Sequence, residues 1–148
     1  MATRNAAALG ALAEWGVRFE RLASPHQVGV FTKAASRATR AFIEEGFRRE
    51  STPNDQKWRP KKRPNGEAIL IEKGRLRKSF SEKVGIGRFV ISNSMPYANA
   101  HQYGYKENNL PRRQMWPSAR RLPVKYVREY TRLFQKHAFK IIKGKGGK

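Results

Sequence analysis

Three histidines are the side chains of this sequence best suited to acid-base catalysis or metal binding near neutral pH. They are His26, His101 and His137, and they lie in separate segments without the close spacing of a metal site. His101 draws attention because Gln102 and Tyr103 follow it directly. For His101 we favour a hydrogen bond to the loop backbone over a catalytic role.

Carboxylates, cysteines and phosphate-binding loops offer no better basis for catalysis. A metal-dependent nuclease needs clustered carboxylates, but the only aspartate is Asp55, and Glu44 and Glu45 are adjacent on a predicted helix and diverge. The chain has no cysteine. The glycines of Val84–Gly87 lead into a predicted strand, whereas a phosphate loop leads into a helix. We therefore expect no catalytic residue, metal or cofactor. A nuclease or toxin would require cleavage that a chelator abolishes.

Net charge is the strongest global feature of the chain. Its 148 residues include 32 Lys plus Arg against 11 Asp plus Glu, which gives +21. Such a charge predicts a polyanionic partner, most simply nucleic acid, or an assembly that neutralises it. The length fits one domain over residues 1–148. No run approaches the roughly 18 apolar residues of a membrane span, and the charged Glu14, Arg18 and Glu20 argue against a cleaved signal peptide. We expect synthesis in a cytoplasm and no membrane partner.

Two amphipathic helices are predicted in the first third of the chain. Over residues 5–22, apolar side chains recur at intervals of three and four. Ser24 then fits an N-cap, because Pro25 suits the first helical position and Gln27 completes a capping box. This second helix is expected to end near Arg49. The apolar stripe of the first helix comprises Ala8, Leu12, Trp15, Phe19 and Leu22.

The middle of the chain predicts loops and a small antiparallel sheet. Residues 50–66 hold three prolines and a basic cluster, so they read as a loop that Trp58 anchors. Residues 73–80 fit one helical turn. Alternating apolar residues predict a β-hairpin over residues 82–93, with Gly87 and Arg88 at the two central positions of a tight turn.

A last helix is predicted over residues 124–142, and the basic segment continues to residue 148. It carries an apolar stripe and, roughly opposite, a basic one that could face solvent, an anionic membrane or phosphate groups. The apolar stripe comprises Val127, Tyr130, Phe134, Ala138 and Ile141. The basic stripe comprises Lys125, Arg128, Arg132, Lys136, Lys140 and Lys143. Together these elements predict an α+β fold in which long amphipathic helices pack on a small antiparallel sheet with extended loops.

The segment from Met95 to Met115 follows neither a helix nor a strand period, so we interpret it as a docking loop of defined shape. Two tryptophans, Trp58 and Trp116, could stack on nucleic acid bases or anchor a core or interface. Anchoring is the commoner fate of tryptophan, and we favour it.

Four segments taken together resemble the phage virion morphogenesis family, the tail completion or neck proteins of Mu-like tailed phages. Tyr97–Gly104 is similar to the family's Tyr-Ala, His-Gln-Phe-Gly signature, and Leu110–Met115 to its Ile-Pro-x-Arg-x-Phe-Leu. Ser51–Pro60 resembles its Pro-Asp-Gly, Trp, Pro-Leu loop, and Ile69–Phe80 its Ile-Leu, Thr-Gly-x-Leu, Ser-Ile block. The order and spacing agree from about residue 28 to 122. The basic last helix has no counterpart in this resemblance.

The resemblance implies a structural virion protein without enzyme activity. It would form a ring, expected to be a hexamer, at the head-proximal end of the tail, where it completes the tail and acts as a head-tail connector. Its partners would be other neck, head-completion and tail-terminator proteins. The predicted subunit or partner interface comprises Trp58, Tyr97, His101, Gln102, Tyr103, Gly104, Arg112, Arg113 and Trp116.

The basic stripe from Lys125 to Lys143 is predicted to face packaged DNA that passes the neck, or an acidic neighbour. The localisation expected from this interpretation is the virion, at the head-tail junction. The alternative function is a free basic DNA- or RNA-binding protein whose last helix carries the affinity.

Overall fold

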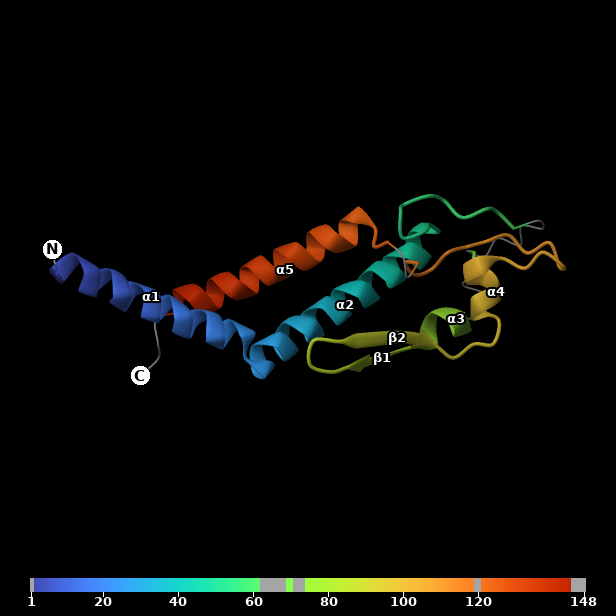
Figure 1. Ribbon diagram of the computed structural model, residues 1–148. Helices are drawn as coiled ribbons and strands as arrows, with labels where there is room; N and C mark the ends of the chain where they lie inside the picture. Colours follow the sequence, from blue (N-terminus) through green and yellow to red (C-terminus); the bar gives the residue numbers. More distant parts are fainter. Residues whose placement is uncertain (1, 62–68, 71–73, 119–120, 145–148) are drawn as a thin grey trace.

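The computed structural model describes residues 2–61, 69–70, 74–118 and 121–144, which form an elongated α+β molecule (Figure 1). Three long helices run along its length, and a two-stranded antiparallel hairpin lies beside the second of them. This confirms the predicted fold class. The elements are α1 (Ala2–Ala23), α2 (Pro25–Arg49), α3 (Arg75–Lys78), β1 (Phe80–Val84), β2 (Phe89–Asn93), α4 (Ala98–Tyr103) and α5 (Val124–Lys143).

The corner between α1 and α2 forms as the capping residues predict. The Ser24 side chain accepts a hydrogen bond from the amide of Gln27 at 3.5 Å, and Pro25 takes the first helical position. The other end of α2 closes at Glu50, which adopts a left-handed conformation with φ 50°. Its amide donates to the carbonyls of Gly46 and Phe47, which satisfies groups that the helix end leaves free.

The hairpin is confirmed, but its turn lies one residue earlier than predicted. Val84 pairs with Phe89, and the amide of Gly85 donates to the carbonyl of Arg88 at 2.8 Å, so the residues between them take the central positions. The second central residue is Gly87, whose φ of +71° favours glycine. Glycine adopts this conformation without the strain that a side chain would bring, so Gly87 suits the second central position. The first strand also begins at Phe80, two residues before the predicted start.

One hydrophobic core joins α2, the hairpin and the loops at one end of the molecule. The ring of Phe47 meets that of Trp58 edge-on at 5.5 Å and that of Phe80 at 6.0 Å. Trp58 is 4% exposed, as its predicted anchoring role requires, and its ring nitrogen donates to the carbonyl of Gln114 at 3.0 Å. The core comprises Ile43, Phe47, Trp58, Ile69, Leu76, Phe80, Ala98 and Met115.

The last helix packs on α2, but through a face rotated from the predicted apolar stripe. Tyr126 is its most buried residue, at 1% exposure, and its ring lies 4.6 Å from that of Phe42. By contrast, Val127 is 48% exposed and Phe134 is 47% exposed, although Phe134 still contacts the ring of Phe31 at 5.5 Å. Tyr130, Ala138 and Ile141 of the predicted stripe are half-buried. Because Val127 and Phe134 are exposed and Tyr126 is buried, the buried face is centred nearer Tyr126 than the spacing indicated.

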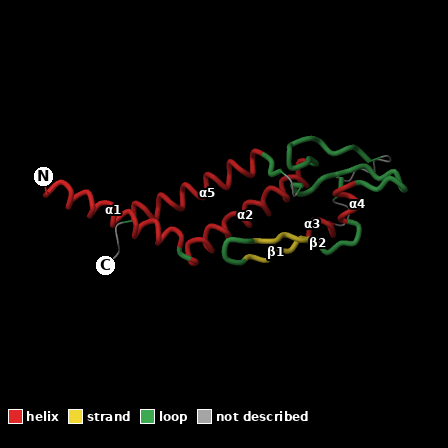
Figure 2. The backbone as a smooth tube through the Cα atoms, viewed as in Figure 1, coloured by secondary structure: helices red, strands yellow, loops and turns green. Residues whose placement is uncertain are grey.

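The described side chains of α1, at positions 13–23, contribute no residue to the hydrophobic core. Trp15 and Phe19 are 44% and 58% exposed, and they pack mainly on each other, with ring centroids 6.0 Å apart. The side chains of Ala8 and Leu12 lie outside the described residues. Figure 2 shows the N-terminal part of α1 continuing past the end of α5, and the loops gathered at the opposite end. Within the described ranges, no helix has the length and apolar character needed to cross a bilayer.

Candidate functional site

Gln102 links the short helix α4 to the irregular segment that follows residue 110. Its side chain is fully buried, with 0% exposure. The side-chain oxygen accepts from the amides of Met115 at 2.8 Å and Trp116 at 3.2 Å, while the side-chain nitrogen donates to the carbonyl of Trp116 at 2.8 Å. All three bonds go to backbone groups that form no regular ladder. Gln102 was predicted at an interface, but the structure places it inside the chain, where it sets loop geometry.

Arg113 joins the same region to the loop after α2. Its side chain is 6% exposed and donates to the carbonyls of Arg59 at 3.1 Å and Pro60 at 3.3 Å. Its amide donates to the carbonyl of His101 at 2.7 Å. Burial lowers the pKa of the Arg113 guanidinium, yet arginine remains charged in proteins. Arg113 therefore acts inside the chain as a cross-link between loops, although it was predicted at an interface.

His101 lies beside Arg113 in a small pocket. The cavity measures about 220 Å³, and its lining includes Leu76, Tyr97, His101 and Arg113. The ring of Tyr97 meets the imidazole edge-on at 5.9 Å, and the buried Nδ1 of His101 has no hydrogen-bond partner among the described residues. Burial lowers the pKa of the His101 imidazole, and the positive charge of Arg113 lowers it further. The hydrogen bond predicted between the His101 ring and the loop backbone is therefore not formed at Nδ1. Instead, the backbone carbonyl of His101 accepts from the amide of Arg113.

The pocket around His101 lacks the groups that acid-base or metal chemistry would need. Its described lining contains no carboxylate that could orient the imidazole or share a proton with it. Among the described residues, no group of three or more His, Asp or Glu side chains lies close enough to hold a metal ion. The arrangement leaves the buried Nδ1 of His101 free to take part in one hydrogen bond.

The predicted interface residues thus divide by exposure. Tyr97 and Tyr103 are 42% and 63% exposed, and Arg112 is also exposed. Gly104 is partly buried at φ +80°, and its backbone approaches that of Arg112. The exposed members could contact a neighbour, whereas the buried ones shape the loop that presents them. The buried members are Trp58, Gln102 and Arg113, and the partly buried ones are His101, Gly104 and Trp116.

The four sequence segments quoted above meet in one place. Trp58 comes from the first, Leu76 and Phe80 from the second, Ala98 from the third and Met115 from the fourth, and all belong to the same core. Gln102 bonds the third segment to the fourth, and Arg113 bonds the fourth to the first. Positions 71–73 of the second segment, and positions 62–66 of the predicted loop, lie outside the described residues.

The basic stripe of α5 is only partly free to meet a partner. Lys125 contacts Asp55, with 2.7 Å between Nζ and Oδ1, and Arg132 forms two hydrogen bonds with Glu129 at 2.6 and 2.8 Å. The bond from Arg132 lowers the pKa of the Glu129 carboxyl. The remaining members are exposed and form no ion pair among the described residues; they are Arg128, Lys136, Lys140 and Lys143.

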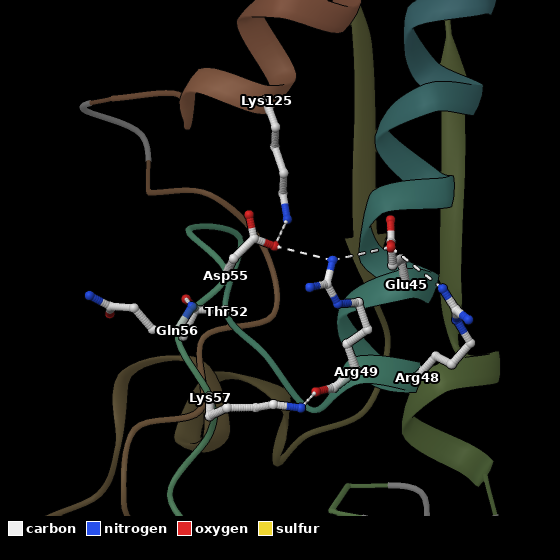
Figure 3. A network of polar contacts seen from close by, with 8 residues as sticks. All are labelled: Glu45, Arg48, Arg49, Thr52, Asp55, Gln56, Lys57 and Lys125. Atoms are coloured by element: carbon white, nitrogen blue, oxygen red, sulfur yellow. Dashed lines mark hydrogen bonds and ion pairs between the residues drawn. The ribbon is translucent and has the colours of Figure 1, made fainter.

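Asp55 ties the start of α5 to the end of α2 (Figure 3). It lies in the loop after α2, and its Oδ1 also approaches Arg49 at 3.9 Å. Arg49 in turn pairs with Glu45 at 3.4 Å, while the amine of Lys57 donates to the carbonyl of Arg49 at 2.6 Å. The sole aspartate therefore orients two elements that carry basic side chains. It does not form part of a carboxylate cluster.

A larger groove lies between α2, α5, the hairpin and α4, and nothing in the sequence spacing indicated it. Its volume is about 570 Å³, and its walls include Ile43, Phe80, Phe89 and Tyr126. The buried hydroxyl of Tyr126 has no hydrogen-bond partner among the described residues, and burial raises its pKa. Nearby, the hydroxyl of Tyr130 shares a 2.5 Å hydrogen bond with Thr39, which helps to hold α5 against α2.

Comparison with known proteins identifies no relative of this chain. No protein-family model, curated protein or solved structure matches this chain.

Proposed function

We propose that this chain is a structural protein of the phage neck, which forms a ring at the head-proximal end of the tail and joins tail to head. The observation that carries the proposal is the His-Gln-Tyr-Gly signature at residues 101–104, accompanied by three further family-like segments in the same order. We also propose that the chain forms this ring from several copies of itself and that the ring lies in the virion.

The arrangement of the four segments supports this proposal. Buried Gln102 and Arg113 use their side chains to satisfy backbone groups of neighbouring segments, which fixes the path of the loop. The same loop presents Tyr97 and Tyr103 at the surface. Exposed aromatic side chains on a rigid frame suit a subunit interface, because they bury a large area at little cost in conformational entropy.

The charge distribution supports a ring that surrounds DNA. A net charge of +21 on one chain opposes assembly of identical subunits unless a polyanion neutralises it. The exposed members of the α5 stripe, among them Arg128 and Lys136, supply cations along a helix. Such a helix lining a lumen would contact the phosphates of passing DNA without reading its sequence.

Deletion in a phage or prophage that encodes this chain tests the proposal. Electron microscopy should show DNA-filled heads and separate, complete-length tails, and supplying the chain in trans should restore joined virions. Joined, infectious particles without the chain would refute the neck role. In vitro, mass measurement and negative-stain images of the purified chain should show rings, and a strictly monomeric chain at all concentrations would count against ring assembly.

The second candidate is a free DNA- or RNA-binding protein, and the unpaired cations of α5 favour it. Binding of a monomer to duplex DNA should then weaken steeply with salt, with a log-log slope of about −0.9 for each phosphate neutralised. Tight, salt-dependent binding by a monomer that forms no ring would favour this candidate. Ring formation with little binding by the monomer would favour the neck protein.

A further inference from the structure

A cationic pocket lies where α1, α2 and the C-terminal part of α5 meet. Its volume is about 420 Å³. Three helices each contribute nitrogen-bearing side chains to its wall, and the described lining contains no carboxylate. The basic residues that line it are Arg21 from α1, His26 from α2, and His137 and Lys140 from α5. Arg21 and Lys140 bring two positive charges to this wall, and the two histidines add ring nitrogens that can bond a ligand. With no carboxylate in the described lining, the pocket favours an anion.

Two further features of the pocket favour an anionic ligand. His137 lines the pocket, and its buried Nε2 has no hydrogen-bond partner among the described residues. His26 and Gln27 lie in the first turn of α2, a helix of 25 residues whose N-terminus carries partial positive charge.

The composition of the wall specifies the kind of anion. Arginine, histidine and lysine together suit a phosphate group, which accepts several hydrogen bonds at once. Val30 and Ile141 form an apolar part of the wall, which suits the carbon skeleton attached to a phosphate ester. Lys140 also belongs to the α5 basic stripe, where Lys136 and Lys143 lie one turn away on either side. The pocket is therefore continuous with the surface proposed to face DNA.

We infer that this pocket, formed by Arg21, His26, His137 and Lys140, binds a phosphate group, most simply one phosphate of a nucleic acid backbone that runs along α5. The inference rests on the proposed contact with DNA and extends it to α1 and α2, which the sequence pattern did not connect with nucleic acid. It also gives α1 a role, since binding would bridge Arg21 to α5.

The experiment compares the chain with a variant that combines Arg21→Gln and Lys140→Gln. Fluorescence anisotropy with a short DNA duplex should show about tenfold weaker binding by the variant at low salt. Its log-log salt slope should be smaller by about 0.9, the value for one phosphate. A control that combines Lys83→Gln and Arg88→Gln removes the same charge from exposed hairpin positions. Equal losses in the two double variants would overturn the inference, because they would show only a net-charge effect.

A second measurement locates the phosphate directly and distinguishes its source. The ring signals of His137 and His26 are followed by NMR while inorganic phosphate, or the duplex, is added to the full chain. Saturable shifts with inorganic phosphate identify a site for free phosphate groups, and shifts only with the duplex identify a backbone-phosphate site. Unmoved signals with both probes would refute the site.

Ring assembly is recorded on the same samples, so that a failed pocket and a failed neck role can be told apart. A chain that forms rings while its pocket ignores phosphate would refute this inference alone. A monomeric chain that binds phosphate at His137 would retain the site and count against the ring.

Discussion

The side-chain oxygen of Gln102 accepts a hydrogen bond from the backbone amide of Met115 at 2.8 Å, in a region with no regular secondary structure on the Met115 side. Here a buried side-chain amide makes the hydrogen bonds to backbone groups that a neighbouring strand makes in a sheet. It satisfies backbone groups that water cannot reach, so the loop can be both irregular and well packed.

Replacing Gln102 with alanine should therefore destabilise the chain strongly. The change leaves the amides of Met115 and Trp116 buried without an acceptor, and it opens a cavity in a site with 0% exposure. We expect a loss of about 3 kcal/mol in the free energy of unfolding. Urea denaturation followed by tryptophan fluorescence measures it. Gln135→Ala, at an exposed position of α5, serves as the control and should change stability by less than about 0.5 kcal/mol. Similar small effects at both positions would contradict the role assigned to Gln102.

Gly104 should tolerate no side chain. Its φ of +80° is open mainly to glycine, and an added Cβ would lie 3.2 Å from both the amide nitrogen of Arg112 and the carbonyl oxygen of Leu110. Gly104→Ala should cost about 2 kcal/mol of stability. The matched control is Gly29→Ala within α2, where an added Cβ meets nothing within 4 Å, and where alanine should stabilise the helix by about 0.5–1 kcal/mol. Thermal unfolding of both variants checks the opposite signs. A stabilising Gly104→Ala would show that the loop can relax.

Local signals account for the parts of the fold that the sequence predicts well. The boundary between α1 and α2 depends on Ser24, Pro25 and Gln27, which act within one turn of each other. The hairpin depends on strand alternation and on Gly87, although two nearby glycines left the turn uncertain by one residue. Such features are readable because the physical cause lies next to its effect in the chain.

The buried face of α5 could not be predicted from local sequence signals. Apolar and aromatic side chains cover a wide sector of this helix, with Tyr126 and Leu133 on one side and Val127 and Phe134 on the other. Periodicity identifies the sector but not which half meets α2. The choice depends on partners far away in sequence, such as the Thr39 hydroxyl that bonds Tyr130.

In the candidate site too, the sequence indicates local features but not the contacts between residues far apart in the chain. The resemblance directed attention to residues 97–115, but Gln102 and Arg113 proved to bond backbone carbonyls and amides, whose positions no side-chain pattern records. The pocket near His137 joins residues more than a hundred positions apart. Only the packing of α1 and α2 against α5 reveals it.

Neutralising Asp55 should have a small and salt-dependent effect on stability. Asp55 is 47% exposed and pairs with Lys125, which is 26% exposed, so solvent screens the attraction. Asparagine also tolerates the left-handed backbone at this position, where φ is 62°, so Asp55→Asn isolates the charge. We expect a loss below about 1 kcal/mol at low salt, shrinking further in about 1 M NaCl. Denaturation at both salt concentrations tests this, with Glu20→Gln, at an exposed position of α1, as the control. A loss above about 2 kcal/mol that salt leaves unchanged would contradict a screened surface pair.

His101 should make the stability of the chain depend on pH. Burial, and secondarily the charge of Arg113, lowers the pKa of the folded-state imidazole below its ordinary value of 6.5. Between the two pKa values, the imidazole is protonated in the unfolded chain but stays neutral in the folded chain. The free energy of unfolding is therefore highest above about pH 6.5 and falls as the pH drops toward the folded-state pKa. His101→Gln removes this contribution, and its stability should decline less than that of the unmodified chain between pH 7.5 and 5. Because carboxylates titrate in both proteins, the difference between the two stability curves is the quantity to measure. Parallel curves, or an NMR titration of the His101 ring with a midpoint above 6.5, would contradict the lowered pKa.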